Sequence, residues 1–457
     1  MLEAPRSWRG PARETALLSG WGRTAPTRAR LLRPCSGEEV ADVLASTNPA
    51  EGGVIARGAG RSYGDAAQNG GGNVLDATAL RGIVALDSER RLVRAGAGTS
   101  FAQLLLALAA KGLTLPVVPG TRHLTVGGAI ASDIHGKNHP RDGSFAHQLE
   151  SFTLCTPAQG PLLVSRVQEP ELFYATIGGM GLTGVVVEAT LRLAPLRSIS
   201  AVADIDRSET IEDALAIMGD DSDHRYRIAW VDLLSPGAGF GRSVITRSEE
   251  APSSGAGAPF PLHPRISVPE AFRGRFVRPA TVGAFNLMHF HTSPQRGRGR
   301  TLTMTEQLFP LDVLGGWNRL YGRGGFRQYQ YVVPAGREDV FVAVVEGLRA
   351  RRAPMYLAVI KRFGPGSGGL LSFPQDGWTF AIDMPADAPG LSAALDQADE
   401  LVAGAGGRVY LAKDSRLRAE MLSAMYPELP RFRELRSRLD PHEVLRSDMG
   451  RRLGLCA

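Results

Sequence analysis

The stretch ARGAGRSYGDAAQNGGG, residues 56–72, contains six glycines and two arginines directly after the short apolar run GVIA. Glycine tolerates positive φ and lets the backbone approach a ligand more closely than a residue with a Cβ would allow. Such a loop predicts a row of N–H donors that binds an anion, although a solvated surface loop is the alternative for this stretch taken alone. The residues of this predicted row are Arg57, Gly58, Gly60, Arg61, Ser62 and Gly64.

Two further glycine clusters follow apolar runs. They are GTRHLTVGGAIASDIHGKN at 120–138 and LFYATIGGMGLTGVVVEATLRLAPL at 172–196. Three such loops in one chain predict a single long ligand, for which a dinucleotide is the natural candidate. A Rossmann site is poorly supported, because no G-x-G-x-x-G lies between a first strand and helix with an acidic residue about 20 positions later.

The elements that must position these loops form two regions. Between 36 and 196, helices are predicted at 37–47 and 100–112, and strands at 53–56, 73–77 and 91–99. Residues 197–400 alternate long strand-like runs with helices such as 337–352, which predicts an antiparallel sheet with helices on one face. Residues 247–275, rich in Pro, Gly and Ser, are predicted to be a mobile loop, and helices return after about 406.

Composition narrows the class of protein. A chain of 457 residues is too long for one simple hydrophobic core, so two domains are expected. A content of 43% hydrophobic and 21% charged residues is typical of a soluble globular protein. Neither a transmembrane run nor a signal-peptide core is evident, so a cytoplasmic protein is expected. Three scattered cysteines predict neither disulfides nor a metal site. The net charge of +6, with seven arginines in the first 34 residues, is expected to form a solvated surface, with an anionic membrane or a phosphorylated substrate as alternatives. Nucleic acid gains no support, since no nucleic-acid-binding module accompanies the charge.

The three glycine clusters, in this order, resemble the FAD-binding domain of the vanillyl-alcohol-oxidase superfamily, also called the PCMH-type fold. Within it the sequence is most similar to the decaprenylphosphoryl-β-D-ribose 2-oxidase family, and the similarity includes GWGRTAP (20–26), FRQYQYVVP (326–334), LSFPQDGW (371–378) and AKDSR (412–416). The resemblance implies an α+β fold of two domains. These would be an FAD-binding domain at 1–196, a substrate domain at 197–405, and a segment at 406–457 that returns to the FAD domain and completes the active site.

The resemblance also implies the residues that hold FAD. The first loop would bind the pyrophosphate through its amides, and the other two would line the remainder of the cofactor. No histidine lies in the first loop, where relatives with a covalent flavin carry one, so the resemblance implies non-covalent FAD. Besides the first-loop residues already named, the implied contacts are Tyr63, Gly120, Thr121, Thr125, Gly127, Gly128, Ser132, Asp133, His135, Gly136, Gly181, Thr183, Gly184, Val186 and Lys413.

The family's reaction would require a base for the proton of a secondary alcohol. Lys413 matches the family's active-site lysine and His135 is the second candidate, and the sequence leaves open which of them is the base. The implied substrate contacts are Tyr63, Lys137, Trp230, Gln328, Gln330, Lys361, Thr379 and Ala381. Some relatives carry cysteine, asparagine and tyrosine where this chain has Ala381, Thr379 and Leu308, which affects the expected pocket and not the FAD loops.

The resemblance therefore implies oxidation of the 2-hydroxyl of a polyprenylphosphoryl-β-D-ribofuranose, completed to an epimerisation by a short-chain NAD(P)H reductase. A quinone or similar acceptor would take the electrons. The basic N-terminus and the 247–275 loop suggest peripheral contact with the plasma membrane. An oxidase of soluble alditols or aldonolactones and a non-catalytic flavin-binding protein are the alternatives.

Overall fold

The computed structural model describes residues 14–219, 221, 223–252, 264 and 266–457. Residues 1–13, and residues 253–263 and 265 of the predicted 247–275 loop, lie outside these residues. Within the described part of that loop, Ile266–Ser267 forms a short strand. Residues 247–250, which were predicted to begin that loop, instead end a strand, because they continue the pairing of Ser243–Glu250 with its neighbours. Among the described residues, no helix is both long and apolar enough to cross a membrane.

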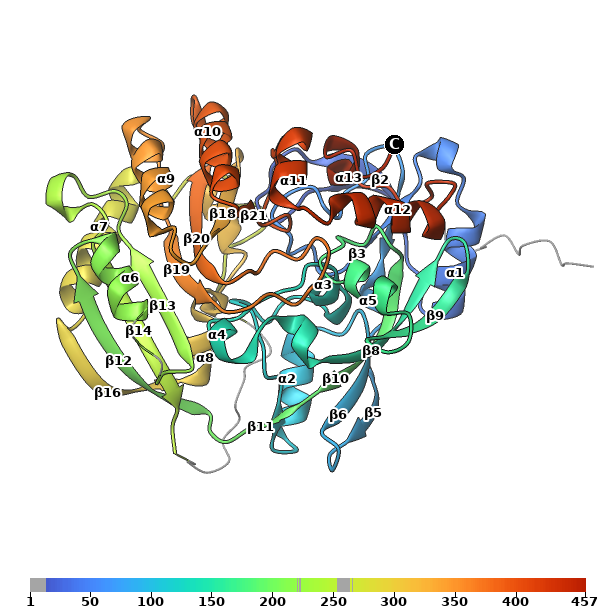
Figure 1. Cartoon of the computed structure of the whole chain (residues 1–457), viewed down its shortest axis with the longest axis horizontal. Helices are drawn as coiled ribbons and strands as arrows, with labels where there is room; N and C mark the ends of the chain where they lie inside the picture. The colour runs from blue at the N-terminus through green and yellow to red at the C-terminus, as the bar shows by residue number, and fades with distance from the viewer. Residues whose placement is uncertain (1–13, 220, 222, 253–263, 265) are drawn as a thin grey trace, which may run out of the picture.

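Two small sheets form the glycine-rich part of the molecule (right side of Figure 1). In the first, of order β1-β2-β4-β3, β4 pairs in parallel with β2 and β3; in the second, of order β5-β6-β10-β8-β9, all pairs are antiparallel. The strands are β1 (Glu14–Leu18), β2 (Thr27–Leu32), β3 (Val54–Arg57), β4 (Asn73–Asp76), β5 (Ile83–Asp87), β6 (Leu92–Gly96), β8 (Leu149–Thr156), β9 (Gly160–Ser165) and β10 (Val185–Arg192).

Short helices accompany these sheets, and α1 and α2 match the predicted positions. Helix α2 starts at a capping box in which the Ser100 hydroxyl accepts from the Gln103 amide and the Gln103 side chain accepts from the Ser100 amide. The helices are α1 (Gly37–Ser46), α2 (Phe101–Ala109), α3 (Val126–Ala131), α4 (His139–Asp142) and α5 (Pro170–Thr176), and β7 (Leu113–Thr114) pairs with β11 (Ala194–Pro195).

An antiparallel sheet of order β16-β12-β14-β13-β19-β20-β18-β21 forms the other part (left side of Figure 1). Helices α6, α9 and α10 pack on one of its faces, as the sequence predicts. The strands are β12 (Ser200–Ser208), β13 (Tyr226–Val231), β14 (Ser243–Glu250), β16 (Arg296–Thr303), β18 (Phe326–Pro334), β19 (Ala358–Phe363), β20 (Gly377–Pro385) and β21 (Arg408–Val409). The helices are α6 (Ile211–Gly219), α7 (Pro279–Thr292), α8 (Met304–Leu308), α9 (Glu338–Ala350) and α10 (Leu391–Gly404), and β15 (Ile266–Ser267) pairs with β17 (Leu314–Gly315).

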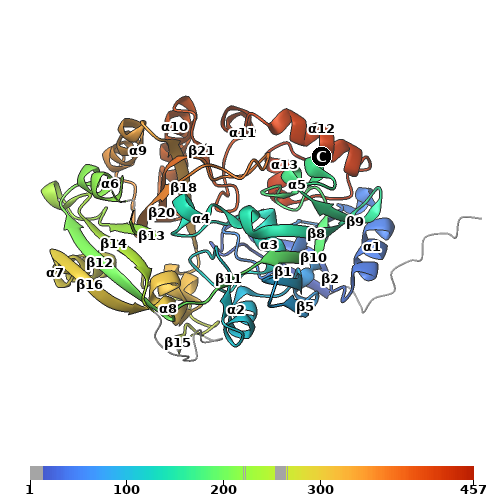
Figure 2. The same ribbon diagram turned by 60° about the horizontal axis from the view of Figure 1, so that its bottom comes forward.

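The C-terminal helices α11 (Ala419–Met425), α12 (Leu429–Leu439) and α13 (Asp448–Arg452) return to the glycine-rich part, where α12 packs on α5 (Figures 1 and 2). A second connection between the two parts is Arg225, just before β13, whose guanidinium donates to both oxygens of Asp142 in α4 over 2.7 and 2.9 Å. Such bidentate pairs fix orientation as well as distance, so the two parts are held in one arrangement around the space between them.

Candidate active site

A cavity of about 610 Å³ lies between the glycine loops and the face of the large sheet that α6, α9 and α10 leave free. This volume is within the range of small-molecule and cofactor sites. Most of the residues predicted from the sequence line it, from all three glycine clusters and four sheet strands. The predicted residues in its wall are Gly58, Gly60, Arg61, Ser62, Tyr63, Gly120, Thr121, Thr125, Gly127, Gly128, Ser132, His135, Gly136, Lys137, Gly181, Gly184, Val186, Trp230, Gln328, Gln330, Lys361, Ala381 and Lys413.

The first glycine loop is packed so closely that side chains are excluded. A Cβ on Gly58 would lie 2.1 Å from the Thr125 Oγ1, and Gly60 adopts a φ of +64°. The Thr125 hydroxyl is itself held at the start of α3, where it accepts from the Gly128 amide. The first two glycine clusters therefore meet at this contact, and their backbones form a continuous wall that fits a ligand bound through main-chain amides.

The opposite wall consists of side chains from the large sheet. Successive residues of a strand point to opposite faces, so only every second residue reaches the cavity. Residues 328 and 330 of β18 line the cavity, whereas Tyr329 and Tyr331 point to the other face and are buried in the core. The same alternation brings Trp230, Lys361 and Ala381 to the cavity from β13, β19 and β20. This wall therefore offers amide and ammonium groups, in contrast to the backbone wall facing it.

His135 lies where the two walls meet. Its Nε2 is 3.1 Å from the Gln330 amide nitrogen, which donates, so the ring proton is on Nδ1. That Nδ1 is buried and has no hydrogen-bond partner among the described residues. Burial, together with the charges of Lys361 and Lys413, lowers the pKa of His135 well below 6.5. A neutral histidine with an unused N–H at the cavity wall is a donor available to a bound ligand.

Lys413 follows β21 and lies at the other junction of the walls. Its Nζ is 3.5 Å from the centre of the Tyr63 ring, a cation–π contact. Burial lowers the pKa of Lys413 to about 7, although Asp383 partly opposes this shift. Burial in turn raises the pKa of Asp383 to about 7. Asp383 accepts from the Gln328 amide over 2.6 Å and from the Tyr321 hydroxyl over 3.2 Å, so it orders the side chains beside the lysine.

The cavity has an excess of cations. Arg61, Lys137, Lys361 and Lys413 line it, against Glu306 and Asp312 as the acidic residues. Asp312 is engaged by the Thr121 hydroxyl and the Arg122 amide. The Lys137 Nζ donates to the Gln307 carbonyl, and burial lowers the pKa of Lys137 to about 7 and of Lys361 to about 8. Desolvated cations without a carboxylate partner favour an anionic ligand.

Besides Gly64, which packs against the Asp414 carbonyl, four predicted contacts lie behind the wall and do not line the cavity. The Arg57 guanidinium donates to the carbonyls of Ser19 and Ala67, which holds the first loop in shape. Three others are fully buried in hydrogen bonds of their own. These are Asp133, which accepts from Ser367 and Ser372, Thr183, which pairs with the Thr176 hydroxyl, and Thr379, which donates to the Tyr331 carbonyl.

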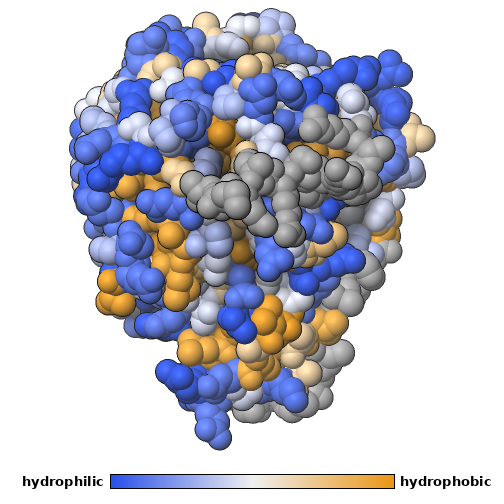
Figure 3. Space-filling model, turned by 90° about the vertical axis from the view of Figure 1, so that its right-hand side faces the viewer, coloured by the Kyte–Doolittle hydropathy of each residue, from blue (hydrophilic) through white to orange (hydrophobic). Residues whose placement is uncertain are grey.

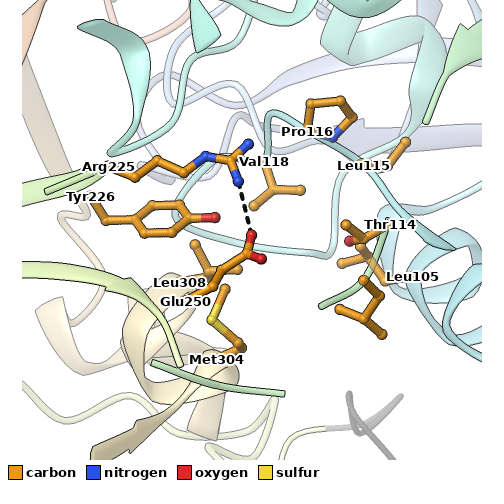
Figure 4. A pocket seen from close by; sticks show the side chains of 11 residues that line it. Leu105, Thr114, Leu115, Pro116, Val118, Arg225, Tyr226, Glu250, Met304 and Leu308 are labelled. Carbon is orange, nitrogen blue, oxygen red and sulfur yellow. Dashed lines mark hydrogen bonds and ion pairs between the residues drawn. The ribbon is translucent and has the colours of Figure 1, made fainter. Parts of the chain in front are cut away.

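Leu308 was expected close to the substrate pocket. It lies instead in a small separate cavity with Leu105 and Met304, where Figure 4 also shows the 2.8 Å ion pair of Arg225 with Glu250. The preceding residue, Gln307, is the one that lines the large cavity. A helical turn at α8 directs successive side chains to different sides, and this separates the two positions.

Several functional neighbours were missed by sequence reasoning. Trp21 lines the cavity and lies under the Arg61 guanidinium at 4.0 Å, although it is far from the glycine clusters in sequence. Phe285 and His289 of α7 cover the cavity beside Trp230. Asp383 was detectable, because it continues the odd-numbered alternation of 379 and 381 along β20.

The C-terminal segment closes the first loop from outside. The Arg452 guanidinium donates to both oxygens of Asp65 over 2.8 and 3.0 Å and lies 2.9 Å from an Asp414 oxygen. The Asp414 carbonyl in turn lies so close to Gly64 that a Cβ there would be only 1.8 Å away. We call Asp65, Asp414 and Arg452 the C-terminal clamp; it fixes the FAD loop against the segment that carries Lys413.

Comparisons with known proteins agree with this site. Residues 29–165 match the FAD-binding domain family, and residues 382–453 match the D-arabinono-1,4-lactone oxidase family. The fold and site are therefore those of an FAD-dependent oxidoreductase of the vanillyl-alcohol-oxidase superfamily. The chain is 40% identical over 455 residues to decaprenylphosphoryl-β-D-ribose oxidase of Mycolicibacterium smegmatis, which covers 96% of this chain and 98% of that protein. The chain belongs to the decaprenylphosphoryl-β-D-ribose oxidase family.

Two further relatives differ in how much of the chain they match. An uncharacterised protein of Streptomyces coelicolor is 42% identical over 367 residues, which cover 78% of this chain and 98% of that protein. The alditol oxidase of a Streptomyces species is 30% identical over 182 residues, covering 40% of this chain and 42% of that protein. The similarity to oxidases of soluble polyols is therefore confined to part of the chain.

FAD is the cofactor, and the residues present fit it. The amide wall suits a pyrophosphate, and the unused His135 N–H and the cations suit a polar ring edge and phosphates. The described residues contain no cluster of three or more His, Cys, Asp or Glu side chains able to hold a metal ion.

Proposed function

We propose that the protein oxidises the 2-hydroxyl of a polyprenylphosphoryl-β-D-ribofuranose to the 2-keto sugar, the first half of its epimerisation to an arabinose donor for cell-wall arabinan. The observation that carries this proposal is the 40% identity to decaprenylphosphoryl-β-D-ribose oxidase over nearly the whole of both chains. A short-chain NAD(P)H reductase would complete the epimerisation, and a quinone or similar compound would accept the electrons.

The site residues divide into three tasks in this proposal. The amide wall, with Arg61 and Thr125, would hold FAD without a covalent bond. Lys137 and Lys361, whose ammonium groups are desolvated, would bind the substrate phosphate. Gln328, Gln330 and Trp230 would bind the sugar against the sheet wall. Residues 1–196 with 406–457 would then form the FAD-binding domain, and 197–405 the substrate domain.

Bound FAD supplies an acceptor for the hydride that leaves the C2 carbon of the sugar. The O–H proton must leave at the same time, and Lys413 is the base that the geometry favours. Its pKa of about 7 leaves a substantial neutral fraction at neutral pH, with a lone pair free to take the proton. His135 is less suited, because its basic Nε2 already accepts from Gln330. Its Nδ1–H would instead orient a ligand oxygen.

The test is anaerobic mixing of the FAD-loaded protein with polyprenylphosphoryl-ribose. Loss of the visible absorbance of oxidised flavin is expected, with formation of a 2-keto sugar detectable by borohydride labelling. Free xylitol and gulonolactone serve as competitors, because the 382–453 match and the alditol oxidase similarity make a soluble-sugar oxidase the second candidate. Reduction by these free sugars alone would establish that second candidate.

Non-covalent attachment is tested on the same preparation. Acid precipitation is expected to release all the flavin into the supernatant, because the first loop offers Arg61, Ser62 and Tyr63 where a linking histidine would stand. Flavin that stays with the precipitated chain would contradict this expectation.

A further inference from the structure

Helix α7 is only weakly amphipathic. Its inward side carries the buried Phe290 and the buried Asn286, whose amide donates to Asp232 over 2.8 Å. Its outward side carries Leu287 and Met288, which are 53% and 58% exposed. A surface helix normally directs its apolar stripe to the core and its polar residues to water. The outward face of α7 is therefore an apolar surface that nothing among the described residues covers.

This face is continuous with the opening of the cavity. Phe285 of α7 lines the cavity and is 49% exposed, so it lies at the rim. On the other side of the rim, Leu311 also lines the cavity and is 40% exposed, followed by the exposed Val313. Contiguous apolar surface beside a pocket marks a site of interaction with an apolar partner.

The charge around α7 is one-sided. Residues 271–305 contain six arginines and no acidic residue. Of these, Arg278 at the start of α7 and Arg296 and Arg300 on the edge strand β16 are exposed and form no ion pair with the described residues. Figures 1 and 2 both place α7 and β16 at the same end of the molecule. Apolar residues surrounded by unpaired arginines match the interface of an anionic bilayer.

We propose that the outward face of α7, with Phe285 and Leu311 at the rim, docks on the surface of an anionic lipid bilayer. This proposal rests on the proposed function and locates the source of its substrate. The polyprenyl chain would pass from the bilayer into the cavity between α7 and the 310–313 turn, without its apolar surface crossing water. The phosphate would follow to the lysines of the cavity wall.

The test is sedimentation of the full chain, loaded with FAD, with phosphatidylcholine vesicles that contain or lack phosphatidylglycerol. Binding is expected to the anionic vesicles and to weaken with salt. The double variant Leu287→Ser/Met288→Ser is expected to bind at least about tenfold more weakly, since two large apolar side chains no longer enter the interface. Arg296→Glu/Arg300→Glu is expected to lose the preference for anionic vesicles.

The matched control is Leu163→Ser/Val167→Ser. These apolar side chains are 52% and 93% exposed, but they lie on and just after β9, at the opposite end of the molecule from α7 (Figure 1), the end that Figure 3 shows with hydrophilic and hydrophobic residues mixed. The control is expected to bind vesicles as the unmodified protein does. Equal binding by the α7 variant and this control, or no vesicle binding by the unmodified protein, would overturn the proposal. Self-association abolished by the α7 substitutions, without vesicle binding, would assign the face to a second copy instead.

Failure here is distinguishable from failure of the proposed function. Neither Leu287 nor Met288 lines the cavity, so reduction of the flavin by a short-chain, water-soluble polyprenylphosphoryl-ribose is expected to be unchanged in the α7 variant. Reduction without vesicle binding would refute the docking and leave the oxidation intact. Vesicle binding is measured without substrate, so its loss in the α7 variant supports the docking surface whatever the outcome of the oxidation assay.

Discussion

The two walls of the cavity are built by opposite means. The FAD wall is shaped by the absence of side chains: a Cβ at Gly58 would lie 2.1 Å from the Thr125 Oγ1, and one at Gly184 would lie 2.7 Å from the Cys155 carbonyl. The sheet wall is shaped by side chains, which alternate along β18, β19 and β20. The first wall therefore recognises by fit to the backbone and the second by charge and hydrogen bonding. Substitutions should accordingly affect cofactor affinity on one side and substrate chemistry on the other.

The largest effect is expected from Lys413→Ala, at the junction of the walls. Loss of a general base reduces the rate of flavin reduction by about 10²–10⁴-fold. The FAD content is expected to stay unchanged, and stopped-flow reduction measures the rate. An unchanged rate would remove Lys413 from the chemistry.

Gly58→Ala is expected to act on the cofactor alone. The new Cβ would lie 2.1 Å from the Thr125 Oγ1, and an overpacking cost of about 1–3 kcal/mol weakens FAD binding by about 10–100-fold. Fluorescence titration of the apoprotein with FAD measures it. Gly347→Ala in α9 is the control, because a Cβ at Gly347 has nothing within 4 Å and this residue does not line the cavity. Equal affinities of the two variants would show that the close packing of the first loop does not matter.

Lys361→Ala is expected to act on the substrate alone. Removing a charge-assisted hydrogen bond of about 1.5–3 kcal/mol raises KM by about 10–100-fold with little change in kcat. The comparison substrate is the same sugar without its phosphate, for which the variant and the unmodified protein should not differ. A fall in kcat with KM unchanged would move Lys361 from phosphate binding to the chemical step.

The pH dependence follows from Lys413. Because its pKa is lowered to about 7, the neutral form that takes the proton predominates above that pH and disappears below it. The value of kcat/KM is therefore expected to rise by about tenfold per pH unit up to about 7 and to fall above about 8, where Lys361 loses the charge proposed to bind the phosphate. If kcat/KM does not fall as the pH is lowered below about 7, the reaction does not use a base with this pKa.

The smallest effect is expected from Ala381→Cys, which places a thiol in the sheet wall. Adding one sulfur atom at a cavity wall should change kcat/KM by less than about tenfold. The variant should nevertheless become sensitive to thiol-directed reagents that enter the cavity, measured as time-dependent inactivation protected by substrate. Resistance equal to that of the unmodified protein would place position 381 out of reach of the cavity.

The difference between the two walls also explains which parts of the site could be predicted from the sequence. The backbone wall was evident because glycine density is a direct sign of close packing, and the strands and helices that carry it fall where hydrophobic periodicity places them. The glycine motifs identify which segments form this wall, but they do not show in which direction each side chain points. Arg57 and Asp133 lie within the predicted loops, yet their hydrogen bonds turn them away from the cavity.

Residues supplied by distant segments were harder to predict. Trp21 and Phe285 enter the cavity wall only through the packing of the β1–β2 connection and α7 against the rest. Trp21 belongs to the GWGRTAP motif, but the motif does not show that this side chain reaches the cavity. Thr379 follows the correct alternation but is covered by Gln330, which donates to its hydroxyl over 3.3 Å. Alternation therefore predicts the face of a strand, whereas neighbouring strands decide whether a residue on that face is reached by ligand.

The C-terminal clamp has a consequence for how the protein matures. Asp65 is synthesised early and Arg452 almost 400 positions later, so the first loop lacks its restraint through nearly all of translation. Closing a loop of that length is entropically costly, and the FAD wall should therefore become rigid only after the ribosome has passed Arg452. Chains truncated before α13 would lack the closed FAD loop and would therefore bind little or no FAD.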